Sequence, residues 1–251
     1  IGNDAFQEVD IVGICRSICK YAVTVRKRED LGRIIKEAFY IAKTGKPGPV
    51  LVDIPKDIQL ALGSDEYPAE VNIRGYKPST GVHIGQLKRA AEMLAQAKRP
   101  LFLIGGGVVV SRAGAELTEL AERTGVPVIT TIMGKGAIST DHPLYIGNIG
   151  MHGNVASNTA VSECDLLFSV GTRFNDRITG KISEFAKNAQ IVHIDIDAAS
   201  ISRNIVVDVP IVADAREALS KFLEIVKIPK NIEEWTNRLQ NRRDEKPSVM
   251  R

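Results

Sequence analysis

Short apolar segments that alternate with helical periodicity are the feature that most constrains the fold of this chain. Five segments have the length and the apolar composition of buried strands, at 100–104, 126–131, 166–170, 191–196 and 209–212. Helical spacing of apolar residues is found at 84–97, 113–124 and 215–227. Because strands that alternate with helices form parallel sheets covered on both faces, we predict an α/β fold with a doubly wound, Rossmann-like central parallel sheet of about six strands.

A second, partial α/β unit is predicted to precede this sheet. A charged start at 28–30 opens a helix that continues to Gly45, and a strand bounded by prolines follows at 49–55. The stretch 61–81 is rich in Gly, Pro and Ser and lacks periodicity, which predicts a linker. We expect a fragment of a longer polypeptide, with the C-terminal part of one domain at 1–60, the linker at 61–81, a central domain at 82–226, and a helix or linker toward a further domain at 227–251.

Composition and charge exclude several classes of protein. Hydrophobic residues make up 44% and charged residues 25% of the 251 residues, which is ordinary for a globular protein and excludes disordered, collagen-like and disulfide-rich chains. The net charge of +3 comes entirely from 227–251, so the rest of the chain has no signature of nucleic-acid binding. The longest apolar runs are too short to span a membrane, and we predict a cytoplasmic protein without membrane or nucleic-acid partners.

Cys15, Cys19 and Cys164 lack the spacing of a zinc site or a disulfide framework, so we predict inert thiols and no metal site.

Ligands of parallel sheets bind beyond the carboxyl ends of the strands, which directs attention to the residues after each predicted strand. Gly105, Gly106 and Gly107 would let backbone amides approach a phosphate without obstruction, although a tight turn explains them equally well. Arg173 and Arg177 could clamp a pyrophosphate while Asp176 orients one of them. The alternative for this second segment is a solvated turn with one salt bridge.

Two further segments could contact a nucleotide or a ring system. The stretch from His193 to Asp197 ends a strand with carboxylates that could accept hydrogen bonds from ribose hydroxyls, or could cap the next helix. The sequence from Gly150 to Gly153 places Met151 and His152 between glycines, which suits contact with a flat ring, although a lone histidine is more often a structural hydrogen-bonding residue.

Six short sequence motifs, taken together, indicate a protein family more specifically than any one of them does alone. They resemble, in order and spacing, the catalytic subunit of the acetolactate synthase (acetohydroxyacid synthase) family of thiamine diphosphate-dependent enzymes: IGNDAFQE (1–8), GKPGPVLVDIPKDIQ (45–59), IGGG (104–107), GMHG (150–153), GTRFNDRITGK (171–181) and IVHIDID (191–197). The resemblance implies a reaction that decarboxylates pyruvate and condenses the hydroxyethyl unit with pyruvate or 2-oxobutyrate in branched-chain amino-acid biosynthesis. Residues 1–60 would be the end of the pyrimidine-binding domain and 82–226 the central FAD-binding domain.

The resemblance also implies roles for individual residues. In the family the central domain holds FAD, without a net redox role, and the full-length enzyme also binds thiamine diphosphate and Mg²⁺. The implied cofactor-binding residues are Gly105, Gly106 and Gly107 at the FAD phosphates and ribose; Thr131, Ile132, Met133, Gly150, Met151 and His152 along the flavin; Gly171, Arg173, Asp176 and Arg177 at the ribityl and pyrophosphate; Asp195, Ile196 and Asp214 at the adenosine; and Lys46, where the family often has Arg, at a phosphate. Phe6 and Gln7 would line the active site, and Lys56, Met151, Asp176 and Arg177 the substrate channel.

Partners and alternatives follow from the same resemblance. The partners implied are 2-oxo acids, a second copy of the chain in a homodimer or higher homo-oligomer, and a small regulatory subunit. Because the family's activating glutamate and its GDG…N metal motif fall outside residues 1–251, the isolated fragment is expected to be inactive. Three alternatives remain: another thiamine diphosphate enzyme, such as a glyoxylate carboligase or an oxalyl-CoA decarboxylase; a stand-alone FAD-binding electron-transfer module; and a structural assembly domain without a nucleotide.

Overall fold

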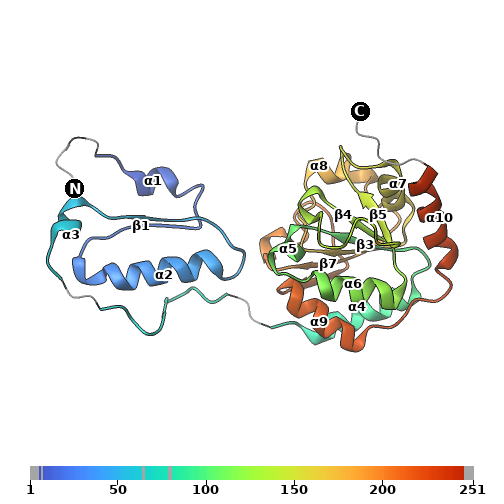
Figure 1. Cartoon of the computed structure of the whole chain (residues 1–251), viewed down its shortest axis with the longest axis horizontal. Coiled ribbons are helices and arrows are strands. Elements are labelled where there is room, and N and C mark those ends of the chain that lie inside the picture. Colours follow the sequence, from blue (N-terminus) through green and yellow to red (C-terminus); the bar gives the residue numbers. More distant parts are fainter. Residues whose placement is uncertain (1–5, 7, 64–65, 79–80, 246–251) are drawn as a thin grey trace. The chain divides into compact units, whose positions relative to one another are not determined.

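The computed structural model describes residues 6, 8–63, 66–78 and 81–245 and divides the chain into two compact units, Ile1–Pro78 and Ser79–Arg251 (Figure 1). Each unit has its own hydrophobic core, and each is described separately below.

The unit Ile1–Pro78 contains a short two-stranded parallel sheet with helix α2 packed against it. Strand β1 pairs with β2 in parallel, with Tyr21 opposite Val50. The core is small and is centred on Val25, Ile34 and Ile58. The elements are α1 (Ile11–Cys15), β1 (Tyr21–Thr24), η1 (Arg28–Asp30), α2 (Leu31–Lys43), β2 (Val50–Asp53) and α3 (Lys56–Leu60). The charged start at 28–30 forms a 3₁₀ turn ahead of α2, and Gly45 adopts a left-handed conformation just beyond the helix, with φ of 57°.

Two lysines bind the stretch after α3 to this unit. The Lys20 ammonium donates to the carbonyl oxygens of Ile41, at 2.6 Å, and of Thr44 and Lys46, and it lies 5.3 Å from the centre of the Tyr76 ring. The Lys36 ammonium donates to the carbonyl oxygens of Pro68 and Ala69 and lies 5.0 Å from the centre of the Tyr67 ring. Residues 66–76 are therefore held beside α2 by the bonds of Lys36 to Pro68 and Ala69 and by the contacts of Tyr76 with Lys20 and Thr44.

The unit Ser79–Arg251 is built on a six-stranded, entirely parallel sheet with the order β5-β4-β3-β6-β7-β8. Counted from β3, this is the order 3-2-1-4-5-6 of the doubly wound dinucleotide-binding fold. The strands are β3 (Pro100–Ile104), β4 (Val128–Thr130), β5 (Tyr145–Asn148), β6 (Leu166–Val170), β7 (Gln190–Asp195) and β8 (Val209–Val212). The predicted α/β class and the parallel sheet of about six strands are confirmed.

Strand β5 is the strand that the sequence pattern does not reveal. It lies within the glycine-rich stretch after β4, and Gly147 in its middle has φ of 140°. The pairing of β4 with β5 also shifts register between Val128 and Ile129. A four-residue strand interrupted by a glycine lacks the longer apolar run of strands such as β3 and β6, which explains why the sequence pattern fails here.

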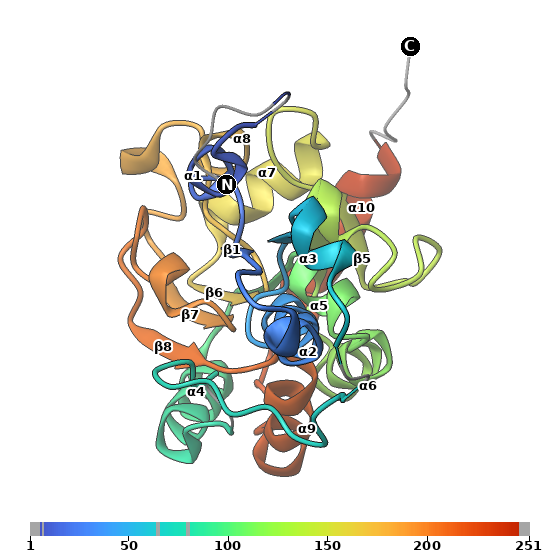
Figure 2. The same ribbon diagram turned by 90° about the vertical axis from the view of Figure 1, so that its left-hand side faces the viewer.

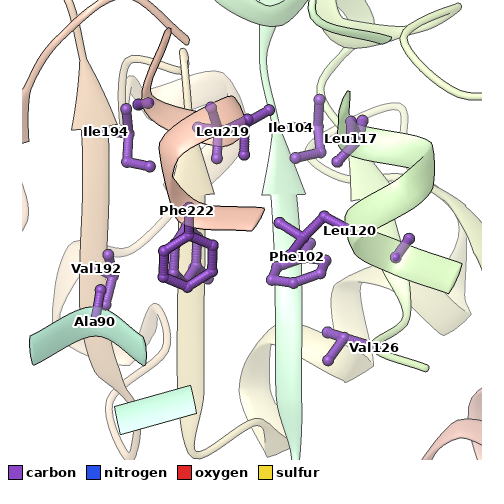
Figure 3. Packing of buried hydrophobic residues seen from close by; sticks show 14 of the residues in the cluster. Ala90, Phe102, Ile104, Leu117, Leu120, Val126, Val192, Ile194, Leu219 and Phe222 are labelled. Carbon is purple, nitrogen blue, oxygen red and sulfur yellow. The ribbon is translucent and has the colours of Figure 1, made fainter. Parts of the chain in front are cut away.

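Helices cover both faces of the sheet. The helices are α4 (Ile84–Gln96), α5 (Gly106–Val110), α6 (Gly114–Thr124), α7 (Val155–Glu163), α8 (Asp176–Thr179), α9 (Ala215–Ile225) and α10 (Glu233–Glu245), with 3₁₀ turns η2 (Ile132–Gly134), η3 (Ile182–Glu184) and η4 (Ala198–Ser200). Helices α4, α6 and α9 share one hydrophobic cluster with the sheet, while α7 and α10 belong to the cluster on the other face (Figure 2). The Phe222 ring from α9 lies 5.0 Å from the Phe168 ring of β6, with Phe102 of β3 beside it (Figure 3).

Helix α10 is docked mainly through hydrogen bonds to backbone carbonyls. The buried Trp235 donates its indole N–H to the Pro100 carbonyl oxygen at 2.9 Å, and Arg243 donates to the Tyr145 carbonyl oxygen at 2.9 Å. Arg238 and Arg242 both lie within 3.1 Å of the Glu163 carboxylate at the end of α7. Residues 233–245, in the stretch predicted to be a helix or linker, thus form a helix that packs beside the edge strand β5. Within the described ranges, none of the helices combines the length and the apolar character needed to cross a membrane.

Candidate functional site

The carboxyl ends of β3 and β6 form the natural ligand-binding position of this sheet. The chain proceeds from β3 to β4 and β5 on one side, and then crosses to β6, β7 and β8 on the other side. The connections after β3 and β6 therefore diverge to opposite sides, and sheets of this kind bind their ligands at this topological switch point. The triple glycine follows β3 and the segment 171–177 follows β6, so the two strongest sequence-predicted segments meet there.

Backbone atoms alone make the contact between these two turns. The Gly105 amide donates to the Val170 carbonyl oxygen, and the Gly107 amide donates to the Gly171 carbonyl oxygen, both at 2.9 Å. A Cβ on Gly107 would lie 2.7 Å from the Gly171 Cα, and one on Gly105 would lie 2.2 Å from the Gly171 carbonyl oxygen. Glycine is thus sterically required on both sides; Gly105 is buried, and Gly107 and Gly171 are partly exposed.

Exposed apolar side chains lie next to the triple glycine. Thr131 follows β4, and its hydroxyl accepts a hydrogen bond from the Gly134 amide at 3.1 Å, which closes the turn η2. This turn holds Ile132 and Met133 outward, each 72% exposed. A Cβ on Gly106 would lie 3.1 Å from the Met133 Cβ, so the turn is directly adjacent to the glycines.

The loop after β5 is joined to the turn after β6. The Asn158 side chain accepts from the Gly150 amide at 3.0 Å and donates to the Gly150 carbonyl oxygen at 3.1 Å. The Met151 amide donates to the Arg177 carbonyl oxygen at 3.0 Å, and Met151 is 63% exposed. His152, in the same loop, is also exposed. These contacts fix a thioether and an imidazole at the surface close to the backbone of Arg177.

The predicted charged cluster after β6 is solvent-exposed. Arg177 Nε lies 3.7 Å from Asp176 Oδ2, and Arg173 is also exposed. An ion pair between two exposed side chains contributes little to stability. Breaking the pair between Arg177 and Asp176 would therefore cost little free energy, and both arginines could pair with an anionic ligand.

The acidic segment after β7 is organised around a buried histidine. His193 is fully buried, and its Nε2 lies 2.9 Å from the Thr172 carbonyl oxygen and 3.8 Å from Asp195 Oδ2. Burial lowers the pKa of His193, although the Asp195 carboxylate and the bond to Thr172 act in the opposite direction. Asp195 Oδ1 accepts the Asp197 amide at 2.8 Å, and Ile196 between them is half-buried.

The remaining predicted residues have local or separate positions. Asp214 caps α9, accepting the Arg216 amide at 2.9 Å and the Glu217 amide at 3.2 Å. The predicted residues of the other unit, Ile1–Pro78, are Phe6, which is 93% exposed; Lys46 and Lys56, which are both exposed; and Gln7, which lies outside the described residues.

The sequence analysis missed two side chains that hold the backbone of the candidate site, Asn158 at Gly150 and His193 at Thr172. Asn158 lies on α7, a helix that was not predicted, so its clamp on Gly150 had no sequence signal. His193 was noted only as a neighbour of the acidic residues, although a histidine inside an apolar strand is a signal of a buried hydrogen bond. In the described parts of the chain, no group of three or more His, Cys, Asp and Glu side chains could hold a metal ion.

Comparisons with known proteins point to one family. Residues 87–222 match the family described as thiamine pyrophosphate enzyme, central domain. The chain is 47% identical over 244 residues, 95% of its length, to a protein of Methanocaldococcus jannaschii named "Probable acetolactate synthase large subunit". It is 44% identical over its whole length to the acetolactate synthase large subunit of Pyropia yezoensis, and 45% identical over 93% of its length to an acetolactate synthase of Mycobacterium bovis. The chain spans 41%, 44% and 38% of the length of these three relatives, respectively.

Proposed function

The chain belongs to the thiamine pyrophosphate enzyme family, whose central domain matches residues 87–222, and from this premise we propose that it is part of the catalytic subunit of an acetolactate synthase. The observation that carries the proposal is the identity of 44–47% to relatives of that name over at least 93% of the chain. The proposed reaction is the decarboxylation of pyruvate and condensation of its two-carbon unit with pyruvate or 2-oxobutyrate, a step of branched-chain amino-acid biosynthesis in the cytoplasm.

The central domain would hold FAD at the carboxyl edge of its sheet. The position of the Gly107–Gly171 contact supports this proposal, because it lies at the switch point of the strand order, where sheets of this kind bind dinucleotides on a glycine-rich turn. The exposed Ile132, Met133 and Met151 support it as well, since they offer an apolar surface to a flat ring system. In the family FAD is structural, so its binding would organise the domain rather than transfer electrons.

Each strand-end segment has a distinct part in this proposal. The backbone of Gly105–Gly107 would contact the diphosphate, and Arg173 and Arg177 would pair with its charge through their guanidinium forks. The segment from Thr131 to Met133, with Gly150, Met151 and His152, would lie along the flavin. Asp195, Ile196 and Asp214 would face the adenosine, with Asp195 held in place by the amide of Asp197.

The unit Ile1–Pro78 would contribute to the reaction center of the full-length enzyme. Thiamine diphosphate and Mg²⁺, bound by the full-length enzyme, would supply the electron sink for loss of carbon dioxide. The Lys56 ammonium at the start of α3 would line the substrate channel and attract the carboxylate of a 2-oxo acid, and Phe6 and Gln7 would line the active site. Lys46 would pair with a phosphate. We also propose a homo-oligomer and a small regulatory subunit as partners, and we expect the isolated 251-residue chain to be inactive.

Flavin binding by the purified chain tests the central part of this proposal. The chain is mixed with FAD and passed through gel filtration, and the visible absorption spectrum of the protein peak is recorded. We expect about one FAD per chain for the wild type and none for the double variant R173A/R177A. Arg89→Ala, an exposed arginine in the middle of α4, is the matched control and should retain flavin.

Two outcomes would contradict the proposal. Wild-type protein that retains no flavin at saturating FAD would remove the nucleotide site. A second contradictory outcome is a bound flavin that exchanges electrons with a redox partner, in a full-length protein that does not turn over 2-oxo acids. That result would favour an electron-transfer module instead.

A further inference from the structure

We propose that His193 is a positioning residue of the nucleotide site, whose buried imidazole joins the turn after β6 to the acidic segment after β7. It would thereby set the spacing between the residues that hold the diphosphate and those that hold the adenosine. The inference rests on the proposed FAD site, and it assigns a role to a side chain that does not itself reach the ligand.

The position of His193 in the sheet explains how one side chain reaches both segments. Strands β6 and β7 pair in parallel register, with Ser169 opposite His193 and Val170 opposite Ile194. His193 is therefore two residues before Asp195 on the same face of β7, and it lies beside the strand that leads directly into Thr172. Its Nε2 is 2.9 Å from the Thr172 carbonyl oxygen and 3.8 Å from Asp195 Oδ2.

Only one side of the imidazole is held by hydrogen bonding. Because a carbonyl oxygen can only accept, Nε2 carries a proton and donates it to Thr172. Burial favours the neutral ring, which leaves Nδ1 without a proton. Among the described residues, His193 Nδ1 has no hydrogen-bond partner, and neither does the buried hydroxyl of Ser169 on the adjacent strand.

Phe174 completes the enclosure of the ring. Its aromatic ring is buried and lies 4.9 Å from the imidazole centre at an interplanar angle of 67°. The residues immediately before and after Arg173 therefore both contact His193, one through a carbonyl and one through an aromatic edge. Displacement of the imidazole would therefore move Arg173 and Asp195 relative to one another. The contacts of His193 are with Thr172, Phe174 and Asp195, and not with Met133 or Met151 themselves.

Substitutions that keep or remove the single donor test this inference. Glutamine can place an N–H close to the position of Nε2, asparagine reaches only the position of the unpartnered Nδ1, and leucine offers no donor. In titrations of the full chain with FAD, followed by flavin fluorescence, we expect H193N and H193L to raise the Kd about tenfold, because the Thr172 carbonyl is left unpaired. H193Q should remain within about threefold of the wild type. Ser169→Ala is the matched control, since its hydroxyl has no hydrogen-bond partner in the part of the chain that the structure describes, and it should leave the Kd unchanged.

The spectrum of the bound flavin separates positioning from general damage. At saturating FAD the visible absorption and circular dichroism of the bound flavin should be the same in H193N, H193L and the wild type, because His193 contacts Thr172, Phe174 and Asp195, whereas the loop with Met151 joins this turn further along, at Arg177. Wild-type affinity in both H193N and H193L would overturn the inference while leaving the proposed flavin site intact. Absence of FAD binding by the wild type would overturn both.

A measurement on the wild type covers the case in which the variants do not fold. The ¹⁵N resonances of the His193 ring, assigned in selectively labelled protein, report the Nε2–H tautomer directly. We expect the Nε2 resonance to shift when FAD is added, because Thr172 and Asp195 are drawn toward the nucleotide. Ring resonances that stay unchanged at saturating FAD would overturn the inference.

Discussion

The amide nitrogen of Gly107 lies 2.9 Å from the carbonyl oxygen of Gly171, so that the turns after β3 and β6 touch through backbone atoms alone. The contact lies where the strand order of the sheet reverses, and a Cβ on Gly171 would lie 2.7 Å from the Gly107 Cα. A side chain on either residue would separate the two turns, so this contact determines how closely the turns approach one another beyond the ends of β3 and β6.

Alanine at Gly171 should destabilise the central unit by more than its backbone conformation alone explains. Gly171 has φ of 62°, and left-handed conformation costs a non-glycine residue about 1–3 kcal/mol, to which overlap with Gly107 adds. Gly125→Ala is the control, because its φ is 69° and its ψ is 9°, and the nearest atom to the added Cβ, Ile232 Cδ1, is 4.0 Å away. Urea unfolding followed by circular dichroism measures both variants. Equal losses would show that the close approach of the turns has no energetic consequence.

Removal of the Trp235 indole donor should weaken the docking of α10. Trp235→Phe retains most of the apolar contact but leaves the Pro100 carbonyl unpaired, and we expect a loss of about 1–3 kcal/mol in the free energy of unfolding. Thermal unfolding by circular dichroism is the appropriate measurement.

Because Trp235 is the single tryptophan of the chain, fluorescence of the wild type reports the same region. A red shift at lower urea than the loss of helical signal would indicate that α10 detaches first, and an unchanged stability of Trp235→Phe would contradict the prediction.

Asn158→Ala should loosen the loop after β5 without unfolding the unit. The side chain is partly exposed, but its amide holds both backbone groups of Gly150, so we expect faster amide hydrogen exchange over residues 150–153 and little change in global stability. Ser162→Ala, one turn further along α7, removes only a hydroxyl bonded to the helix itself and serves as control. Exchange measured by mass spectrometry should differ between the two variants in peptides that contain Met151. Identical exchange there would show that other contacts hold the loop.

The stability of the central unit should fall in acid partly through Glu116. Its hydrogen bond to Arg216, at 2.7 Å, lowers the pKa of the carboxyl below its ordinary value of 4.5. A carboxylate whose pKa is lowered on folding adds stability above the ordinary value and loses it as the pH falls through the lowered one. Glu116→Gln should therefore reduce the difference between urea midpoints at pH 6 and pH 3. A variant with the wild-type pH dependence would contradict this assignment.

Cys164 should resist thiol reagents in the native protein. Burial raises the pKa of this thiol to about 12, so almost no thiolate is present at pH 8, and the side chain is fully enclosed. Reaction with Ellman's reagent should show a slow phase that disappears in 6 M urea and becomes smaller in Cys164→Ser, because the buried Cys15 also contributes to it. Partly exposed Cys19 should account for the faster phase, which Cys19→Ser would remove while leaving the slow one. Rapid reaction of all three thiols in the native chain would contradict the prediction.

Periodicity and turn chemistry predict most of the central fold, and the failures have physical causes. Strands β3 and β6 are continuous apolar runs with both faces buried, which is why they are visible in the sequence. Strand β5 and helix α7 are not, because Gly147 interrupts one and the polar residues of α7 give the other almost no amphipathic pattern. The glycine and arginine segments were identified because strand ends carry ligands. The supporting roles of Asn158 and His193 depend on contacts between segments distant in sequence, which no local pattern contains.

The two lysines that bind residues 66–76 to α2 have a consequence for proteolysis. Trypsin cleaves after a lysine only when the extended side chain can enter its specificity pocket. The ammonium groups of Lys20 and Lys36 are instead occupied by backbone carbonyls and shielded by tyrosine rings. Digestion of the folded chain would therefore begin at other basic residues, such as the exposed Lys27 and Arg74, and chemical acetylation of the lysines would loosen the stretch after α3 and open it to proteases that do not recognise lysine.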